Sequence, residues 1–476
     1  MTQRPEGTAS LIARVQRDLE LIAHPRMPWL VPHKAPDGTD ALDVLIVGAG
    51  QSGIVTAFGL KRARVDNISV LDGAPRGLEG PWLTYARMRT LRSPKDFTGP
   101  DLDIPSLTYQ SWHEAKFGIE SWLELKLIPK ELWAEYLLFV RECSGVSVQN
   151  NRRVTAIEPE ADLLRVTAVG AHGEVETYYT RKIVLATGQD GMGEWWMPDD
   201  IRALPSYLRA HAADEIDFAS LKGKTVAVLG AGASAFDNAA MALEHGAAEV
   251  HLFCRRAEPQ VVQPYRWLTF AGFLRHMSDL DDAWRWRFMS TILGMREGFP
   301  QDTYDRCAKY PNFHLQTGAP IHAVRETTAG SLELETPRGL FDADFLICGT
   351  GVEMEFKRRP ELDRFAFNIA TWGDKYAPPV EETDARLGRF PYLGSDYAFV
   401  EKVPGLTPWL GNVHLFSIAS TMSFGPSGSS INAMTTAVPK LVSGITRSFF
   451  VADLDRHWAS LKAYNVPQAI MKTAAE

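Results

Sequence analysis

The sequence predicts an α/β protein with two Rossmann-like dinucleotide-binding domains, the second inserted in the first, and with a helical insertion. Two observations predict this fold class. From residue 43, an apolar strand, a G-x-G-x-x-G turn and an Ala- and Leu-containing helix follow one another. The same order returns from residue 225, where the turn reads G-x-G-x-x-A. Two such units imply two bound nucleotides.

Each glycine of the first turn has a physical role. Gly48 lets the chain turn off the strand, Gly50 lets the backbone approach a pyrophosphate, and Gly53 lets helix and strand pack closely. The helix start offers unpaired N–H groups to the phosphates. Asp72 ends the next apolar strand, near the position expected of an acid that binds a ribose hydroxyl group. The alternative is a glycine turn in an ordinary α/β unit, with Asp72 only a strand-end acid.

The second unit differs at the end of its second strand, residues 250–254. Arg255 and Arg256 follow this strand in place of an acid. Two guanidinium groups suit a 2′-phosphate, so the second nucleotide is predicted to be NADPH. The alternative is a solvated basic pair. The predicted NADPH-binding residues are Gly230, Gly232, Ala233, Ser234, Ala235, Arg255 and Arg256.

Composition excludes several classes of function. The chain has 476 residues, of which 45% are hydrophobic, which predicts two or three folded domains. A net charge of −8 gives no basic field for nucleic acid or an anionic membrane, and no apolar run is long enough to span a bilayer. The 4 scattered cysteines predict a reducing, cytoplasmic location and disfavour a disulfide reductase, which needs a closely spaced cysteine pair. No histidine spacing predicts a metal site.

The start of the chain reads as a helical extension rather than as a secretory signal. Leu11, Val15, Leu19 and Ile22 form one helical stripe in a segment charged throughout. The predicted domains are this extension at 1–40, the first part of the first nucleotide domain at 41–190, the second nucleotide domain at 191–351 and the rest of the first domain at 352–476.

Other segments fit the same plan. Residues 152–180 alternate like a small antiparallel layer. The apolar stretches 183–188 and 345–351 end in small residues. After each of them the chain is expected to leave one nucleotide domain and enter the other. Residues 258–310 are aromatic and mostly helical, and we interpret them as an insertion in the second domain that covers a cavity. A helical cap with only a packing role is the alternative.

This layout resembles the class B flavin-dependent monooxygenases, which include flavin-containing, N-hydroxylating and Baeyer–Villiger monooxygenases. The resemblance covers most of residues 40–450. It rests on the order of the first fingerprint, the Ala186-Thr187-Gly188 turn, the second fingerprint with its arginine, and the second small-residue turn. It implies FAD in the first unit and NADPH in the second. The expected FAD-binding residues are Gly48, Gly50, Gln51, Ser52, Gly53, Asp72, Trp82, Gly188 and Ser427.

Two of these residues belong to segments with their own interpretation. Gly80-Pro81-Trp82, together with Asp103, resembles the flavin-side segment of the Baeyer–Villiger enzymes, where the tryptophan lies beside the flavin and the acid partners an arginine. Ser427 precedes a helix expected from about residue 431 to 445, whose first N–H groups would face the flavin. A serine-rich N-cap without a ligand is the alternative.

The subtype stays open because the local motifs disagree. Residues 88–94 look more like the N-hydroxylating enzymes. The segment 204–211 keeps only the histidine of the linker fingerprint that two subtypes share, and the D-x-x-x-T-G stretch of the N-hydroxylating enzymes is absent near the C-terminus.

The resemblance implies insertion of one oxygen atom from O₂ into a small organic substrate through a C4a-(hydro)peroxyflavin. Amines and sulfides react with the protonated form, whereas ketones need the anion, which an active-site arginine favours. Arg306 paired with Asp103, and also Arg92, are the candidate catalytic residues, with a surface arginine as the alternative. We therefore favour N- or S-oxygenation, with Baeyer–Villiger oxygenation next. A flavin reductase or oxidase that uses NADPH without oxygen insertion is the alternative of another class.

Overall fold

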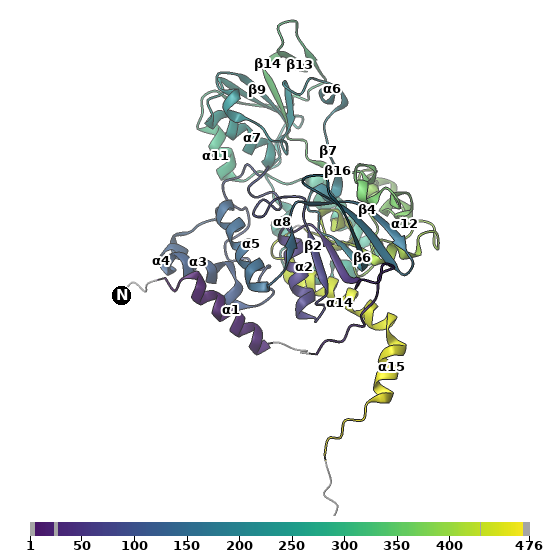
Figure 1. Ribbon diagram of the computed structural model, residues 1–476. Coiled ribbons are helices and arrows are strands. Elements are labelled where there is room, and N and C mark those ends of the chain that lie inside the picture. The colour runs from purple at the N-terminus through teal and green to yellow at the C-terminus, as the bar shows by residue number, and fades with distance from the viewer. Residues whose placement is uncertain (1–4, 23–26, 429, 470–476) are drawn as a thin grey trace, which may run out of the picture.

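The computed structural model describes residues 5–22, 27–428 and 430–469. A mixed sheet and a parallel sheet lie at opposite ends of the molecule, with helices packed around each (Figure 1). The α/β fold class predicted from the two glycine-rich turns is confirmed. The boundaries of the domains stay predictions.

The lower sheet in Figure 1 has the strand order β3-β2-β1-β6-β5-β4, with β17 also paired to β6. Its strands are β1 (Leu42–Val47), β2 (Ile68–Leu71), β3 (Val148–Gln149), β4 (Arg152–Glu160), β5 (Leu163–Gly170), β6 (Val175–Leu185) and β17 (Val413–Leu415). The long strand β6 takes part in two kinds of pairing. Its first half pairs antiparallel with β5, and its second half lies parallel between β1 and β17. The antiparallel layer expected at 152–180 is therefore present.

The upper sheet is parallel, in the order β11-β10-β9-β15-β8. Its strands are β8 (Arg209–His211), β9 (Thr225–Leu229), β10 (Glu249–Cys254), β11 (Phe313–Thr317) and β15 (Phe345–Cys348). Helix α7 (Ala233–Glu244) packs on one face. A small antiparallel sheet packs on the other face, and it consists of β12 (Ala323–Glu326), β13 (Leu332–Thr336) and β14 (Gly339–Ala343).

Two chain segments connect the upper and lower parts, and they pair with each other. The strand β7 (Gly193–Trp195) lies antiparallel to β16 (Val352–Met354), between the two sheets in Figure 1. The first segment falls in the stretch that precedes the second nucleotide unit, and the second follows the small-residue turn at 349–351. The chain therefore passes out of the first sheet and returns to it along one paired ribbon.

The remaining helices surround the lower sheet or join the two parts. Close to the lower sheet are α1 (Thr8–Ile22), α2 (Gln51–Arg62), α3 (Tyr109–Phe117), α4 (Ile119–Glu124), α5 (Lys130–Ser144), α12 (Trp372–Lys375), α13 (Thr421–Phe424) and α14 (Met434–Ala452). The others are α6 (Asp199–Arg202), α8 (Pro264–Trp267), α9 (Ala271–His276), α10 (Asp282–Met295), α11 (Gln301–Ala308) and α15 (Leu454–Ala463). Within the described residues, no helix is long and apolar enough to cross a membrane.

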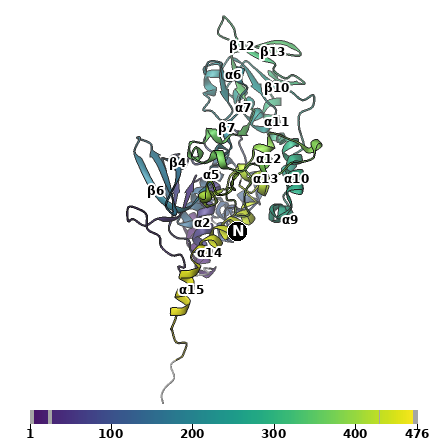
Figure 2. The same ribbon diagram turned by 90° about the vertical axis from the view of Figure 1, so that its right-hand side faces the viewer.

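The insertion at 258–310 divides between the two parts of the molecule. Phe273, Trp286 and Met289 of α9 and α10 are buried in the core of the lower sheet, and Figure 2 shows these helices beside α12 and α13. Cys307 of α11 is buried in the core of the upper sheet instead. The insertion therefore contributes side chains to both cores, which its sequence position did not reveal, and its assignment to the second domain stays a prediction.

The N-terminal stripe packs for most of its length. Leu11 and Val15 are fully buried, Leu19 packs against the same core, and Ile22 is half exposed. At the other end of the chain, α15 has no buried residue and projects from the body (Figure 1).

A buried histidine makes the lower sheet sensitive to acid. His414 of β17 is fully buried, and its Nδ1 lies 2.8 Å from the carbonyl oxygen of Asp396. Burial, aided by the nearby Lys182, lowers the pKa of His414 from 6.5 to about 4. The folded protein therefore holds this imidazole neutral at a pH where an unfolded chain would protonate it.

We expect the contribution of His414 to stability to be complete above pH 6.5 and to be lost between pH 6.5 and 4, because at this residue only the unfolded state binds the extra proton there. The shift corresponds to ~3 kcal/mol, and His414→Gln should remove much of this dependence. Thermal unfolding across this pH range measures it, with exposed His172→Gln as the control. An equal acid loss in wild type and His414→Gln would contradict the assignment.

Candidate active site

The first glycine-rich turn is held by direct backbone contact. Gly48 has φ +102°, and a Cβ there would lie 2.4 Å from the carbonyl oxygen of Ala186. A Cβ on Gly53 would lie 1.8 Å from the carbonyl oxygen of Gly48. A Cβ on Gly50 would meet nothing closer than 3.8 Å, at Gly80. The protein itself therefore excludes side chains at Gly48 and Gly53, whereas Gly50 faces open space where a ligand backbone can approach.

Asp72 braces this turn. Its Oδ2 accepts a hydrogen bond from the N–H of Ala49 at 2.7 Å, and its Oδ1 accepts one from the N–H of Ala74 at 2.7 Å. Burial raises the pKa of Asp72, and these two hydrogen bonds oppose the rise. Each carboxylate oxygen retains a second lone pair, so binding of a ribose hydroxyl group, the role predicted for Asp72, remains compatible with this geometry.

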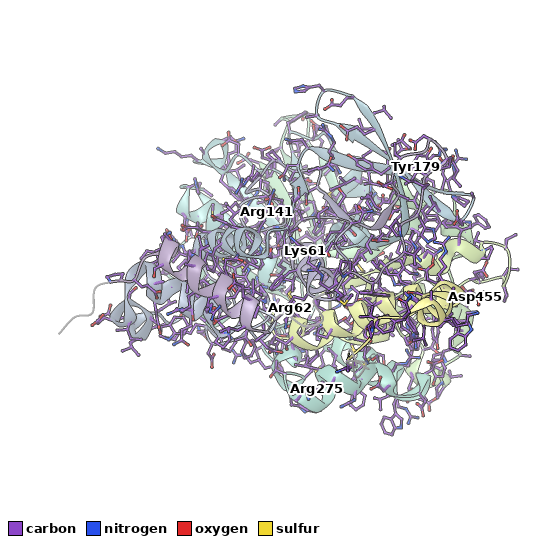
Figure 3. All side chains as sticks on the ribbon, turned by 60° about the horizontal axis from the view of Figure 1, so that its bottom comes forward. Lys61, Arg62, Arg141, Tyr179, Arg275 and Asp455 are labelled. Atoms are coloured by element: carbon purple, nitrogen blue, oxygen red, sulfur yellow. The ribbon has the colours of Figure 1, made fainter. Side chains whose placement is uncertain are left out.

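A small pocket opens beside the turn. Ala49, Gly50 and Trp82 line it, and so do Glu79 and Arg141, which form an ion pair at 3.0 Å. Arg141 belongs to α5 and is labelled in Figure 3. The indole N–H of Trp82 is buried without a hydrogen-bond partner. An open glycine face and an unpaired donor in one cavity fit a bound flavin dinucleotide, because a ligand can use both.

The C-terminal end of α2 anchors the helix that carries the turn. Lys61 donates a hydrogen bond to the carbonyl oxygen of Gly145 at 2.5 Å, and Arg62 donates one to that of Leu102 at 2.8 Å. Both side chains are labelled in Figure 3. Cations in the last turn also complement the helix dipole. These bonds tie the end of α2 to the residue that follows α5 and to the loop that precedes α3.

The remaining predicted FAD residues surround this helix start. Ser52 donates a hydrogen bond to the carbonyl oxygen of Gly428 at 3.1 Å, and Gln51 accepts one from Trp133 at 3.4 Å. A Cβ on Gly188, which has φ +59°, would meet no atom within 4 Å. The structure thus gathers these residues at the edge of one sheet, while their contacts with FAD stay a prediction.

Ser427 does not cap the following helix. Its hydroxyl is buried 3.5 Å from that of Ser420. Residues 421–424 form the separate helix α13, which ends at Gly425 with φ +68°, and α14 starts only at Met434 with Ala433 as its N-cap. The alternative of a serine N-cap is therefore wrong for Ser427, which lies between two helices, and the helix expected from about residue 431 begins at Met434.

The second glycine-rich turn repeats the first with one exchange. Gly230 has φ +117°, and its Cβ would lie 2.5 Å from the carbonyl oxygen of Gly349, while Gly232 faces open space. A Cβ on Gly349 would lie 2.6 Å from the Cβ of Ala235. In the first unit Gly53 packs on Ala186, and here Ala235 packs on Gly349. The second motif has Ala235 in place of the third glycine, and the absence of a side chain at Gly349 makes room for it. Ala233 and Ser234 begin α7.

Arginines gather beyond β10. Arg255 and Arg256 are exposed, and Arg256 donates a hydrogen bond to the carbonyl oxygen of Met295 at 3.3 Å. Burial lowers the pKa of Arg296, and so do the neighbouring charges of Arg386, Arg255 and Arg256. Positive charge crowded beside a nucleotide turn suits a phosphate. Sequence reasoning missed Arg296 and Arg386, because no local pattern connects them to this turn.

The predicted catalytic pairing of Arg306 with Asp103 was wrong. Arg306 donates hydrogen bonds to Asp237 at 3.1 Å and to both carboxylate oxygens of Glu244 at 3.0 and 3.1 Å. Arg92 also pairs with Asp237, at 3.0 Å. Asp103 is exposed in a loop with φ +66°. The structure does not bring the three predicted residues together, because α7 supplies closer acids.

These charges form a bridge between the two parts of the molecule. Asp237 and Glu244 lie on α7, whereas Arg89 and Arg92 belong to the loop that follows β2 and precedes α3. Arg89 pairs with Glu244 at 2.9 Å. The side chains of Asp237 and Arg306 are only 3% and 8% exposed. Burial raises the pKa of Asp237, and Arg92 and Arg306 oppose the rise. Removing one partner of such a buried network is costly.

Comparisons with known proteins agree with this architecture. Residues 45–271 match the model of the pyridine nucleotide-disulphide oxidoreductase family. A protein named FAD-dependent urate hydroxylase, from Xanthomonas campestris pv. campestris, is 38% identical over 460 residues, which cover 96% of this chain and 95% of that protein.

Solved structures share the fold at low identity. Ornithine hydroxylase from Pseudomonas aeruginosa, in its reduced form, matches with a TM-score of 0.65 and 17% identity, over 86% of this chain and 99% of that one. L-lysine 6-monooxygenase from Pseudomonas syringae matches with a TM-score of 0.63 and 20% identity, over 85% of this chain and 99% of that one.

We predict that Gly50→Val folds but loses FAD, because the added side chain enters only the open space beside the turn. Flavin absorbance of the purified protein, together with its thermal unfolding, measures this. Gly411→Val is the matched control, since a Cβ there also meets no atom within 4 Å. A folded Gly50→Val protein with the flavin content of wild type would contradict the placement of the dinucleotide.

We predict that Arg92→Gln slows flavin reduction by NADPH by about tenfold, which corresponds to ~1.4 kcal/mol, while flavin content stays unchanged. The substitution loosens the bridge between α7 and the lower part of the molecule and leaves Arg306 to neutralise Asp237. Anaerobic stopped-flow reduction measures the rate. The control is Arg325→Gln, whose exposed side chain pairs with Glu333 inside the small antiparallel sheet. Equal rates in all three proteins would exclude a positioning role.

Proposed function

Because the chain belongs to the class B flavin-dependent monooxygenases, we propose that it transfers one oxygen atom from O₂ to an electron-rich atom of a small heterocycle of the urate type. The name of the relative that is 38% identical over nearly the full chain supports this substrate class. In atom balance, substrate, O₂, NADPH and a proton give the oxygenated substrate, NADP⁺ and water. Amines and sulfides, which the sequence analysis favoured, also accept the oxygen at an electron-rich atom and are the second candidates. The fold shared with N-hydroxylating enzymes supports them.

The observation that carries this proposal is the neutralisation of both candidate arginines. Oxygenation of a ketone needs an arginine that stabilises a peroxide anion. Arg306 and Arg92 are instead bound to the carboxylates of Asp237 and Glu244. Neither guanidinium is left to favour the anion, which supports transfer of oxygen to a nucleophilic substrate atom.

The chain's own residues hold the cofactors and keep water out. Bound FAD, when reduced by NADPH, supplies the activated oxygen. Gly50 and the N–H groups that begin α2 would bind the pyrophosphate of FAD. The unpaired indole N–H of Trp82 would donate a hydrogen bond to the same cofactor. Trp133 and Tyr136, which are buried behind Trp82, form an apolar wall that excludes water from this side.

NADPH would be held at the other sheet. Gly232 and the start of α7 would bind its pyrophosphate, and the cluster of Arg255, Arg256 and Arg296 would bind its 2′-phosphate. The charged bridge through Asp237 would then fix the angle at which the nicotinamide approaches the flavin.

We expect oxygenated urate as product when urate, NADPH and heavy-isotope O₂ are supplied, with one labelled atom in the product. Mass spectrometry measures incorporation for urate, ornithine, a thioether and a cyclic ketone in parallel, with NADPH consumption recorded beside product. Labelled lactone from the ketone, together with no labelled urate, would contradict transfer of oxygen to an electron-rich substrate atom. Hydrogen peroxide as the sole product with every substrate would favour an oxidase.

A further inference from the structure

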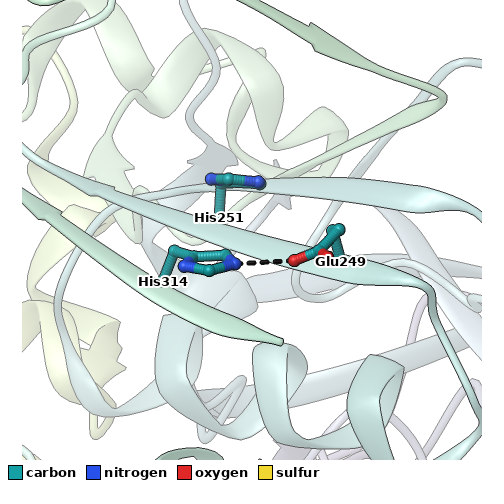
Figure 4. Close-up of side chains that lie close together, drawn as sticks. All are labelled: Glu249, His251 and His314. Carbon is teal, nitrogen blue, oxygen red and sulfur yellow. Dashed lines mark hydrogen bonds and ion pairs between the residues drawn. The ribbon is translucent and has the colours of Figure 1, made fainter. Parts of the chain in front are cut away.

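Three potential metal ligands share one face of the upper sheet. Glu249 and His251 lie two residues apart on β10, so their side chains point the same way. His314 on β11 stands directly opposite His251 in the parallel register. Figure 4 shows the two imidazole rings one above the other, with Glu249 beside them. This juxtaposition arises from strand register, so sequence spacing alone did not reveal it.

The distances between these side chains are close to those of a coordination sphere. Nε2 of His314 lies 2.6 Å from Oε2 of Glu249, and the two rings have centroids 4.6 Å apart with an interplanar angle of 22°. One ligand atom from each residue lies within 4.8 Å of the others. Ligands of one tetrahedral zinc ion lie about 3.3 Å apart, given bonds of about 2.0 Å. Small rotations of these half-buried side chains would bring their ligand atoms to the spacing found around a zinc ion.

From this geometry we propose that Glu249, His251 and His314 bind one divalent transition-metal ion of the zinc class. Two imidazoles and one carboxylate favour Zn²⁺, Ni²⁺ or Cu²⁺ over Mg²⁺ or Ca²⁺, which prefer oxygen ligands. The side-chain amide nitrogen of Gln316 lies 3.4 Å from Nδ1 of His251 and is a polar neighbour of this ring. Because the three side chains are partly exposed, a water molecule can occupy the fourth coordination position.

The position of this cluster separates it from both nucleotide sites. It lies on the face opposite α7, where Phe341 of the small antiparallel sheet packs 5.9 Å from His251. Because β11 is the edge strand of the sheet, an ion bound here ties that edge to β10. Binding therefore stabilises the upper part of the molecule without competing with NADPH.

The test is a Zn²⁺ titration of the chelator-treated, FAD-loaded protein by calorimetry, with thermal unfolding recorded in parallel. We expect one saturable ion per chain and a raised unfolding temperature, and His251→Gln and His314→Gln should each weaken binding at least tenfold. The matched control is His322→Gln, an exposed histidine outside the cluster, which should bind as wild type does. The Michaelis constant for NADPH should stay unchanged on addition of Zn²⁺.

The proposal is overturned if both cluster variants bind Zn²⁺ as wild type does, or if His322→Gln loses as much affinity as they do. Cu²⁺ added to wild type gives a readout that does not depend on the folding of variants. Its electron paramagnetic resonance spectrum should show coupling to imidazole nitrogen from two rings. A spectrum with coupling to one ring, or to none, contradicts the site.

Discussion

The close contact of backbone with backbone at two turns determines where everything else lies. At Gly48 the chain passes so near Ala186 that no side chain fits, and at Gly230 it passes as near Gly349. Each contact fixes the start of one helix, α2 or α7, against the carboxyl ends of the parallel strands of its own sheet. Nucleotides bind at this edge, because helix N–H groups converge there. Two such contacts in one chain give two nucleotide sites.

Buried charge sets the relation between these sites. The two sheets are connected by the β7–β16 ribbon and by the insertion at 258–310, which packs in both cores. Asp237 and Glu244 on α7 engage Arg89 and Arg92 from the other part of the molecule, with Arg306 between the two acids. Because breaking such a network leaves a buried charge unpaired, it favours one orientation of the two sheets. Arg92 and Arg306, the candidate catalytic residues of the sequence analysis, contribute to this orientation instead.

Much of the fold could be predicted because its signals are local. The two glycine turns, the strand that ends before Gly188 and the antiparallel layer at 152–180 each occupy a short stretch with its own periodicity. The features that sequence did not reveal depend on tertiary contact. Nothing near Arg306 indicates that Asp237 is its partner, and nothing in residues 258–310 indicates that Phe273 packs on the lower core. Even the exchange of Gly53 for Ala235 is explained only by the opposing strand.

One chain holds FAD and NADPH so that a hydride passes between them, and every other functional inference depends on this. Anaerobic titration of the purified protein with NADPH, followed by the visible absorbance of the flavin, tests it most directly. We expect a yellow protein whose flavin band bleaches with a stoichiometric amount of NADPH. A protein that carries no flavin and takes none up, or one whose flavin band NADPH leaves unchanged, would contradict the account.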